Sequence, residues 1–172
     1  MENISFTFKN GSSLTMCDLE DFRDTLEPKH TVVTLCRYPP RFIDSDKQER
    51  HHYYFRAHND DPNIWQHASE LVLGLLDEGK DVLLHCVHGR DRTGGVGYIV
   101  LRILISEMGL HPNCFDLHAK SSDTDSVTDL MALLRPKIGD IFKEKVASKQ
   151  ILYDHVFNTV SLRRIHDNKD GR

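Results

Sequence analysis

The residues of this chain best suited to chemistry lie in one short stretch, VLLHCVHGRDRTGG, at residues 82–95. An aliphatic run leads to Cys86, and a glycine-rich loop follows that ends at Arg92 and Thr93. A strand, a glycine-rich loop and a helix in this order direct backbone N–H groups and a helix N-terminus towards an anion. The stretch therefore predicts an anion site that contains a sulfur atom.

Cys86 and Arg92 can act on one tetrahedral phosphate if the loop between them curls around it. The guanidinium group offers two parallel donors to phosphate oxygens, and the surrounding N–H groups favour a nucleophilic thiolate. Gly89 lets the backbone approach the oxygens, and the hydroxyl group of Thr93 can hydrogen-bond the sulfur and help it leave. We expect Cys86 and Arg92 to be catalytic and the whole loop to bind phosphate, namely Val87, His88, Gly89, Arg90, Asp91 and Arg92.

HCVHGRDRTG resembles the signature of the cysteine-dependent protein tyrosine and dual-specificity phosphatases, which is His-Cys, five residues, Arg, then Ser or Thr. Every signature position matches, with His85 and Thr93 as supporting residues, and the short chain resembles a compact, atypical member. The resemblance implies a two-step mechanism, in which the thiolate of Cys86 attacks phosphorus and water then hydrolyses the thiophosphate. It implies no metal and no cofactor.

The general acid that protonates the leaving oxygen has several candidates. In the family it is usually an Asp on a loop upstream of the nucleophile, and the segment 53–65 occupies that place. Asp60 and Asp61 are candidates there, although alignment on the preceding strand puts His58 at the usual position, and an acidic pair before a proline suits any helix start. Asp91 is similar to the loop aspartate of myotubularin-like and bacterial lipid phosphatases. We expect Asp60 or Asp91 to be the acid, and we prefer Asp60.

The remaining loop residues bear on the choice of substrate. CVHG, with His88, looks like the Cys-x-His-Gly of RNA 5′-triphosphatases, whereas Arg90 and Asp91 suggest a phosphoinositide. We expect a phosphorylated protein as partner. Phosphotyrosine is the expected main substrate, and phosphoserine or phosphothreonine is a further one. An RNA 5′ end or a phosphoinositide is the alternative with the same chemistry. A pseudophosphatase that only binds phosphorylated partners is the alternative from another class, although a binder has no need of the thiol.

Cys36 carries a further expectation from the resemblance. It ends a strand that we expect beside the one leading to Cys86, as a backdoor cysteine does in the phosphatase-and-tensin homologue lineage. Oxidation could then form a reversible Cys36–Cys86 disulfide that protects the nucleophile. A small core residue is the alternative.

The elements that position the loop follow from the hydrophobic periodicity. Alternating or compact apolar runs predict strands at 4–8, 31–36, 53–57 and 81–86, and apolar residues at helical spacing predict helices at 19–26, 62–78, 96–104, 123–135 and 148–162. Strands that alternate with helices, followed by a helical tail, predict an α/β fold. We expect a single domain with a central, mostly parallel sheet flanked by helices, similar to the dual-specificity phosphatases.

Composition limits the remaining possibilities. The 172 residues suit one domain, 1–172, with a polar, frayed tail from about 163. A net charge of −4 with interspersed signs predicts no stable binding to nucleic acid or membrane, and we expect a monomer. The four cysteines have no paired spacing, and no histidine pair has metal-ligand spacing, so we expect no metal. No apolar run approaches membrane-spanning length, and a cytoplasmic protein is expected.

Overall fold

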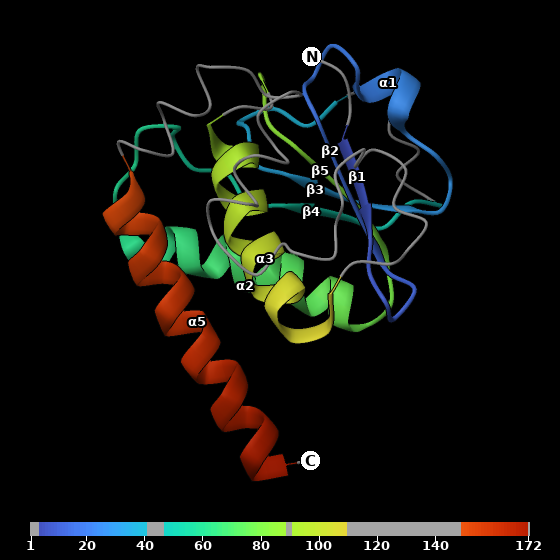
Figure 1. Cartoon of the computed structure of the whole chain (residues 1–172). Coiled ribbons are helices and arrows are strands. Elements are labelled where there is room, and N and C mark those ends of the chain that lie inside the picture. The colour runs from blue at the N-terminus through green and yellow to red at the C-terminus, as the bar shows by residue number, and fades with distance from the viewer. Residues whose placement is uncertain (1–3, 41–46, 89–90, 110–148, 172) are drawn as a thin grey trace.

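The computed structural model describes residues 4–40, 47–88, 91–109 and 149–171, with the side chains of the last helix up to Asp167. Its strands are β1 (Ile4–Thr7), β2 (Ser13–Cys17), β3 (His30–Thr34), β4 (Arg50–His52) and β5 (Asp81–His85), and its helices are α1 (Phe22–Thr25), α2 (Pro62–Asp77), α3 (Arg92–Met108) and α5 (Gln150–Gly171). The strands form a sheet in the order β1-β2-β5-β3-β4, in which only β1 is antiparallel to its neighbour. The predicted single α/β domain with a mostly parallel sheet between helices is confirmed (Figure 1).

The alternation of side chains along the strands separates the two faces of the sheet. Val33 and Leu84 are register partners and belong to the large core under α2 and α3. Val32 and Leu83, one residue earlier on each strand, point to the opposite face and pack with Phe22 of α1. Strand β5 is therefore buried on both faces. Cys86, which follows it, lies at the carboxyl end of the central strand of the sheet.

Strand β2, which reads SLTMC, is missing from the predicted elements. Leu14 and Met16 alternate with Ser13 and Thr15, but this strand signal is short. β2 pairs with β1 on one side and with β5 on the other, from Ser13 opposite Asp81 to Cys17 opposite His85. This pairing on both edges adds to a weak local signal.

The predicted strand at 53–57 is wrong in position, because the strand β4 lies three residues earlier. The backbone at 53–55 remains beside the end of β3, where the N–H groups of Tyr53 and Phe55 donate to the carbonyls of Thr34 and Leu35 at 2.9 and 3.5 Å. β3 ends at Thr34, so no regular ladder can continue beyond that point. The segment leaves the sheet at its carboxyl edge and leads towards α2.

The helices start and stop where capping and packing require. Asp61 accepts a hydrogen bond from the N–H of Asn63 at 3.0 Å and caps α2, which confirms the helix-start interpretation of this residue. α3 begins at Arg92, four residues before the predicted start, and the sequence pattern misses this first turn because glycines carry neither an apolar signal nor a helix preference. A Cβ atom at Gly95 would lie 2.6 Å from the ring of Trp65, so only glycine allows this close approach.

Helix α1 is shorter than the predicted helix 19–26. The carboxylate of Asp18 accepts a hydrogen bond from the N–H of Asp21 at 2.7 Å, and this turn delays the helix until Phe22. The predicted helix at 123–135 lies outside the described residues. Among the described helices, none is long and apolar enough to cross a lipid bilayer.

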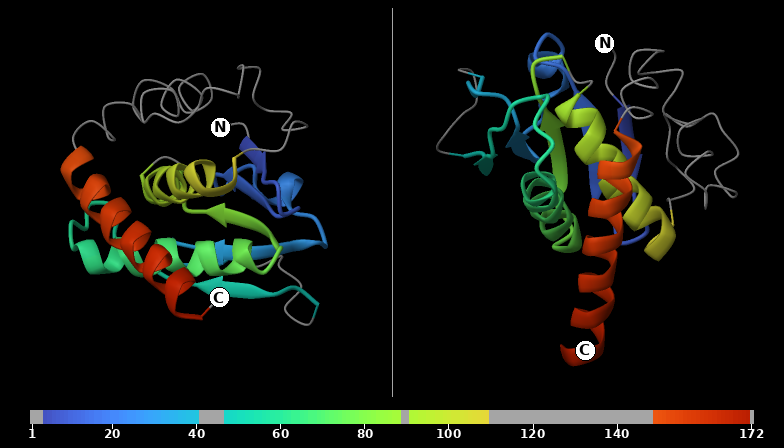
Figure 2. Two further views of the ribbon diagram at one scale, coloured as in Figure 1. Left: turned by 60° about the horizontal axis from the view of Figure 1, so that its bottom comes forward. Right: turned by 90° about the vertical axis from the view of Figure 1, so that its left-hand side faces the viewer.

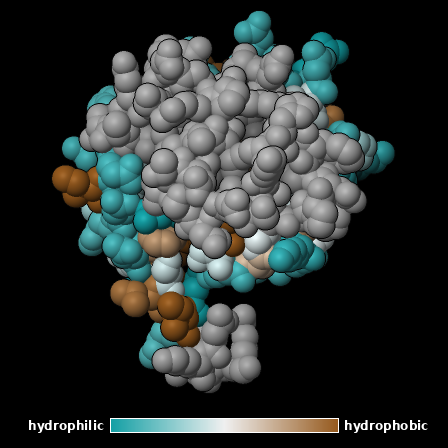
Figure 3. Space-filling view, in the orientation of Figure 1, coloured by the Kyte–Doolittle hydropathy of each residue, from teal (hydrophilic) through white to brown (hydrophobic). Residues whose placement is uncertain are grey.

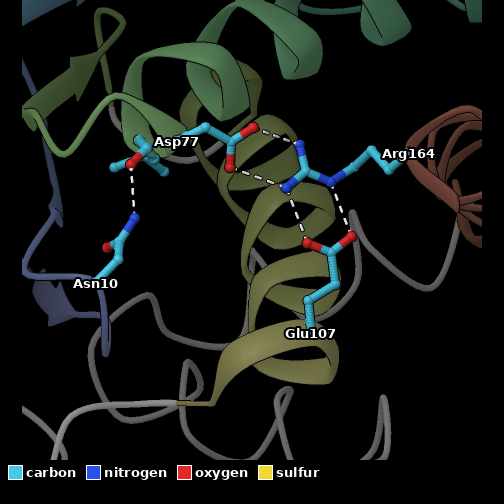
Figure 4. A network of polar contacts seen from close by, with 5 residues as sticks. Asn10, Asp77, Glu107 and Arg164 are labelled. Carbon is cyan, nitrogen blue, oxygen red and sulfur yellow. Dashed lines mark hydrogen bonds and ion pairs between the residues drawn. The ribbon is translucent and has the colours of Figure 1, made fainter. Parts of the chain in front are cut away.

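Helix α5 packs across α2 and α3 and extends beyond the rest of the domain at its C-terminal end (Figure 2). Arg164 holds it there, since its guanidinium donates to Asp77 of α2 and Glu107 of α3 at 2.8 to 2.9 Å (Figure 4). The predicted frayed tail from about 163 is therefore wrong, because the helix continues through Gly171. Hydrophobic side chains are visible on the outer side along the course of α5 (Figure 3), and the exposed ones are Ile151, Leu162 and Ile165.

Candidate active site

Cys86 lies at the carboxyl edge of the sheet, directly after the central strand β5. Its side chain is buried, with 2% exposed, whereas Val87 and His88 face solvent. α3 begins six residues after Cys86, so the loop connects the carboxyl end of a strand to the N-terminus of a long helix. In open α/β sheets ligands bind in this position, beside the carboxyl ends of the strands. Gly89 and Arg90, both predicted to bind phosphate, lie outside the described residues.

Arg92 returns to the same edge as Cys86. Its Nη1 donates to the carbonyls of Phe55 and Leu35 at 3.0 and 3.4 Å. The N–H of Leu35 in turn donates to the carbonyl of His85 at 3.0 Å, which places the guanidinium beside the end of β5. Burial raises the pKa of the Cys36 thiol. The charge of Arg92 opposes this shift and the sulfur of Cys86 adds to it, so both groups lie near Cys36. The structure thus places Cys86 and Arg92 at the same edge of the sheet, and their catalytic roles remain a prediction.

Two buried donors at this edge have no hydrogen-bond partner among the described residues. They are Nε of Arg92 and the hydroxyl group of Thr93, whose side chain is fully buried. Buried polar atoms are nearly always hydrogen-bonded in proteins, so each exception calls for an explanation. An oxyanion at the loop would accept from both donors, and the charge of Arg92 would strengthen the bonds.

His85 holds the backbone of Cys86 in place from the face of the sheet that packs against α1. Its Nδ1 lies 3.3 Å from the carbonyl of Cys86, its Nε2 lies 2.7 Å from Oγ1 of Thr34, and its ring stacks 4.6 Å from Phe22. Burial lowers the pKa of His85 to about 4, so the ring is neutral and one nitrogen donates while the other accepts. The carbonyl of Cys86 can only accept, so Nδ1 donates to it and Nε2 accepts from the hydroxyl group of Thr34.

Thr34 is a site residue that the sequence does not single out. It lies inside the apolar run TVVTLC, where a hydroxyl group has no obvious use. Its register partner on β5 is His85, and this pairing makes the contact. The local signal in the sequence is a polar residue near the end of an apolar run, and the structure shows that this residue is buried.

The acid candidates fall in two places. Asp60 and His58 are exposed and line a cavity beside the first turns of α5, whereas Asp61 is used as the cap of α2. Asp91 occupies the N-cap position of α3, next to Arg92, without a side-chain capping bond. The pKa of Tyr153 is raised by burial and further by the negative charge of Asp91, so this carboxylate lies near that ring. Asp60 therefore lies on the segment before α2, whereas Asp91 lies within the loop itself.

The cysteines Cys17, Cys36 and Cys86 carry thiols rather than disulfides, and they lie at or just beyond the ends of three adjacent strands. Burial raises the pKa of Cys17 to about 12, and the carboxylate of Asp18 adds to this effect. The thiol of Cys36 donates to the carbonyl of Tyr38 at 3.5 Å. The Cys36–Cys86 disulfide remains a prediction.

The comparisons with known proteins agree with this geometry. The model of the tyrosine phosphatase family matches residues 18–107, more than half of the chain, including the loop and the segment 53–65. TpbA of P. aeruginosa is similar in structure, with a TM-score of 0.57 and 17% identity over 86% of both chains. A mutant form of Tk-PTP has a TM-score of 0.51 and 17% identity over 93% of this chain and 95% of its own.

At such identities the two structures show a shared fold alone. No curated protein matches the chain. The family match covers β5, Cys86 after it and Arg92 at the start of α3. The buried thiol, the cation and the donors without partners among the described residues lie at the carboxyl ends of the strands, where open α/β sheets bind ligands. The chain belongs to the tyrosine phosphatase family.

Proposed function

We propose that the chain hydrolyses phosphomonoesters through a thiophosphoryl enzyme. Its main substrate is phosphotyrosine in proteins, and phosphoserine or phosphothreonine is a second substrate. The thiolate of Cys86 attacks phosphorus, the P–S bond forms as the P–O bond to the leaving group breaks, and an acid protonates the leaving oxygen. Water then attacks the thiophosphate, its proton passes to the same carboxylate, and inorganic phosphate leaves as Cys86 regains its electron pair.

One observation carries this proposal. Arg92 Nε and the Thr93 hydroxyl are buried and without partners among the described groups, and they lie on the first turn of α3, six and seven residues after the buried thiol. Donors held ready in this way cost no reorganisation when charge develops on the transferring phosphoryl group. The neutral His85 contributes by donating to the carbonyl of Cys86, which fixes the backbone that carries the thiol.

Asp60 is the proposed acid and Asp91 its rival. Asp60 lies five residues after Phe55, whose carbonyl accepts from Arg92, and it acts as the acid if this segment brings its carboxylate to the leaving oxygen. Asp91 is already in the loop, beside Arg92. A general acid must come within hydrogen-bond reach of the leaving oxygen, and this requirement distinguishes the two in the test below.

The test is hydrolysis of para-nitrophenyl phosphate and of an alkyl phosphate by the wild type, Cys86→Ser, Asp60→Asn and Asp91→Asn. We expect the wild type to turn over the aryl ester and Cys86→Ser to lose at least about 10⁴-fold in kcat, since the nucleophile is removed. Loss of the true acid should reduce kcat by about 10²-fold or more on the alkyl ester and by less on the aryl ester, whose leaving group needs little protonation.

Two outcomes would change the proposed function. A wild type inert on both esters but able to bind phosphopeptides would indicate the pseudophosphatase. Faster hydrolysis of an RNA 5′-triphosphate or a phosphoinositide than of phosphotyrosine peptides would indicate the non-protein substrates, for which the exposed His88 is available. We place the protein in the cytoplasm, because a catalytic thiol must stay reduced.

A further inference from the structure

A cavity of about 700 Å³ opens between residues 58–62 and the first turns of α5. Cavities of this size commonly hold ligands that are mostly apolar with a few polar anchors. The two walls come from segments far apart in the chain, joined where Lys149 Nζ donates to the carbonyl of Ala57 at 2.8 Å. The mechanism proposed above uses only Asp60 of the residues that line it.

The cavity lies close to the candidate active site on both of its walls. On one wall, His58 comes three residues after Phe55, whose carbonyl accepts from Arg92, so their Cα atoms are at most about 11 Å apart. On the other wall, Leu152 precedes Tyr153. Burial raises the pKa of Tyr153, and the negative charge of Asp91 in the loop raises it further. Two to four residues of extended peptide cover such a distance.

The lining combines an apolar wall with a fixed cation. Pro62, Ile151 and Leu152 supply the apolar surface, and Ile151 is 89% exposed, which is unusual for so large a hydrophobic side chain. The ammonium group of Lys149 is held by the carbonyl of Ala57 and lies 5.0 Å from the ring centre of Trp65. Its position is therefore set before any ligand arrives, which lowers the entropic cost of binding.

The polar lining favours an acidic peptide over the other substrates. Among the described residues of the lining, Lys149 is joined by His58 and His155 as hydrogen-bond donors, and Asp60 is the acidic residue. This set, with its fixed ammonium group beside an apolar wall, suits a single carboxylate with a hydrophobic neighbour. A polyanionic lipid headgroup or an RNA chain calls for several cations to meet several phosphates.

We propose that this cavity binds the segment of a phosphoprotein that flanks the phosphorylated residue. An apolar side chain of the substrate packs on Ile151 and Leu152, and an acidic side chain pairs with Lys149. This subsite rests on the proposed function, because it presupposes that the phosphorylated residue of a protein enters the loop at Cys86.

The test uses exposed positions, so that the variants fold. Ile151→Glu and His155→Glu each place a negative charge in the cavity, and Leu162→Glu on the same helix, 66% exposed and outside the cavity lining, is the matched control. The substrates are a phosphotyrosine peptide with flanking leucine and glutamate, the same peptide with glycine and glutamine there, and para-nitrophenyl phosphate.

We expect each cavity variant to lower kcat/KM for the acidic peptide, relative to para-nitrophenyl phosphate, by about 5- to 20-fold, because an apolar contact is lost and a like charge gained. The loss should appear in KM, since flanking contacts act on ground state and transition state alike. Leu162→Glu should keep the wild-type ratio. An unchanged ratio in both cavity variants, or an equal loss on the two peptides, would overturn the proposal.

Failure of the proposed function is recognised separately, as a wild type that does not hydrolyse para-nitrophenyl phosphate. In that case, the affinity of Cys86→Ser for the two peptides, with and without Ile151→Glu, decides on the cavity. Weakening of only the acidic peptide by about 5-fold or more supports it, and equal affinities refute it.

Discussion

Two arginines of this domain occupy opposite situations. Arg164 donates from three nitrogens to the carboxylates of Asp77 and Glu107, and these bonds raise its pKa above the usual value. Among the described residues, Arg92 donates only to backbone carbonyls, its Nε has no partner, and no carboxylate lies within ion-pair distance. The first arginine is fully compensated and joins three helices. The second has, within that part of the chain, a donor still to be used beside a buried thiol, as expected where an anion binds.

The difference teaches how a structural cation can be told from a functional one. A long, charged side chain in a folded protein normally finds opposite charge or water, since burial without either costs free energy. A fold retains an exception only if something else gains from it, and we propose that the gain here is the capacity to bind phosphate. The predictions that follow test this contrast, beginning with the largest effect.

Replacing Arg92 should affect activity far more than stability. We expect Arg92→Met to lower kcat for para-nitrophenyl phosphate by at least about 10³-fold, because it removes the charged donors to the transition state. The free energy of unfolding should change by less than about 1 kcal/mol, since the bonds lost are only those to two carbonyls.

Inorganic phosphate provides the control for this prediction. At about ten times its Kd, phosphate should stabilise the wild type by about 1.4 kcal/mol in a denaturation experiment and leave Arg92→Met unaffected. A large loss of stability in Arg92→Met, with the phosphate effect retained, would show that Arg92 is a structural residue like Arg164.

The neutral ring of His85 should make the site sensitive to acid. Its pKa is about 4 in the folded protein and about 6.5 in the unfolded chain, because burial opposes the charge. Between these values the unfolded chain binds the extra proton, so the contribution to stability is complete above pH 6.5 and is lost as the pH falls to 4. The full difference amounts to about 3 kcal/mol.

Urea denaturation of the wild type and His85→Asn at pH 7 and pH 4.5 measures this effect. The wild type should lose more stability than the variant over this range, by up to about 3 kcal/mol, since asparagine does not titrate. Parallel losses in the two proteins would mean that other groups cause the acid sensitivity.

Removal of Arg164 should affect stability rather than activity, in contrast to removal of Arg92. We expect Arg164→Met to lower the free energy of unfolding by about 2 kcal/mol, because its side chain is largely buried and four charge-assisted bonds are lost. Its kcat on para-nitrophenyl phosphate should stay within about 2-fold of the wild type, since the pair is remote from the loop.

The neighbouring Arg163 is the matched control. Its side chain is 60% exposed and pairs with Glu70 at 3.1 Å, so Arg163→Met should cost under about 0.5 kcal/mol. Equal losses in the two variants would show that burial does not distinguish these pairs.

The sequence predicts the architecture and the loop better than the groups around the loop. β5 and the start of α2 are correctly predicted, because a strong apolar run and a capped helix with proline carry local signals. β2 is not, since its local signal is short and its pairing with β1 and β5 adds to it. The acid stays open for a related reason: Asp61 serves as a helix cap, but whether Asp60 or Asp91 reaches the leaving oxygen depends on distances that no pattern encodes.

The sequence alone determined the candidate nucleophile Cys86 and the cation Arg92, because a loop with five residues between them, ending at a helix, is a local structure. Only the tertiary structure decided what meets that loop. The hydroxyl group of Thr34 reaches His85 across 51 positions, Arg92 reaches the carbonyl of Phe55 across 37, and Lys149 reaches that of Ala57 across 92. Contacts between residues so far apart depend on strand order and helix packing, and these follow from burying the whole chain's apolar surface together.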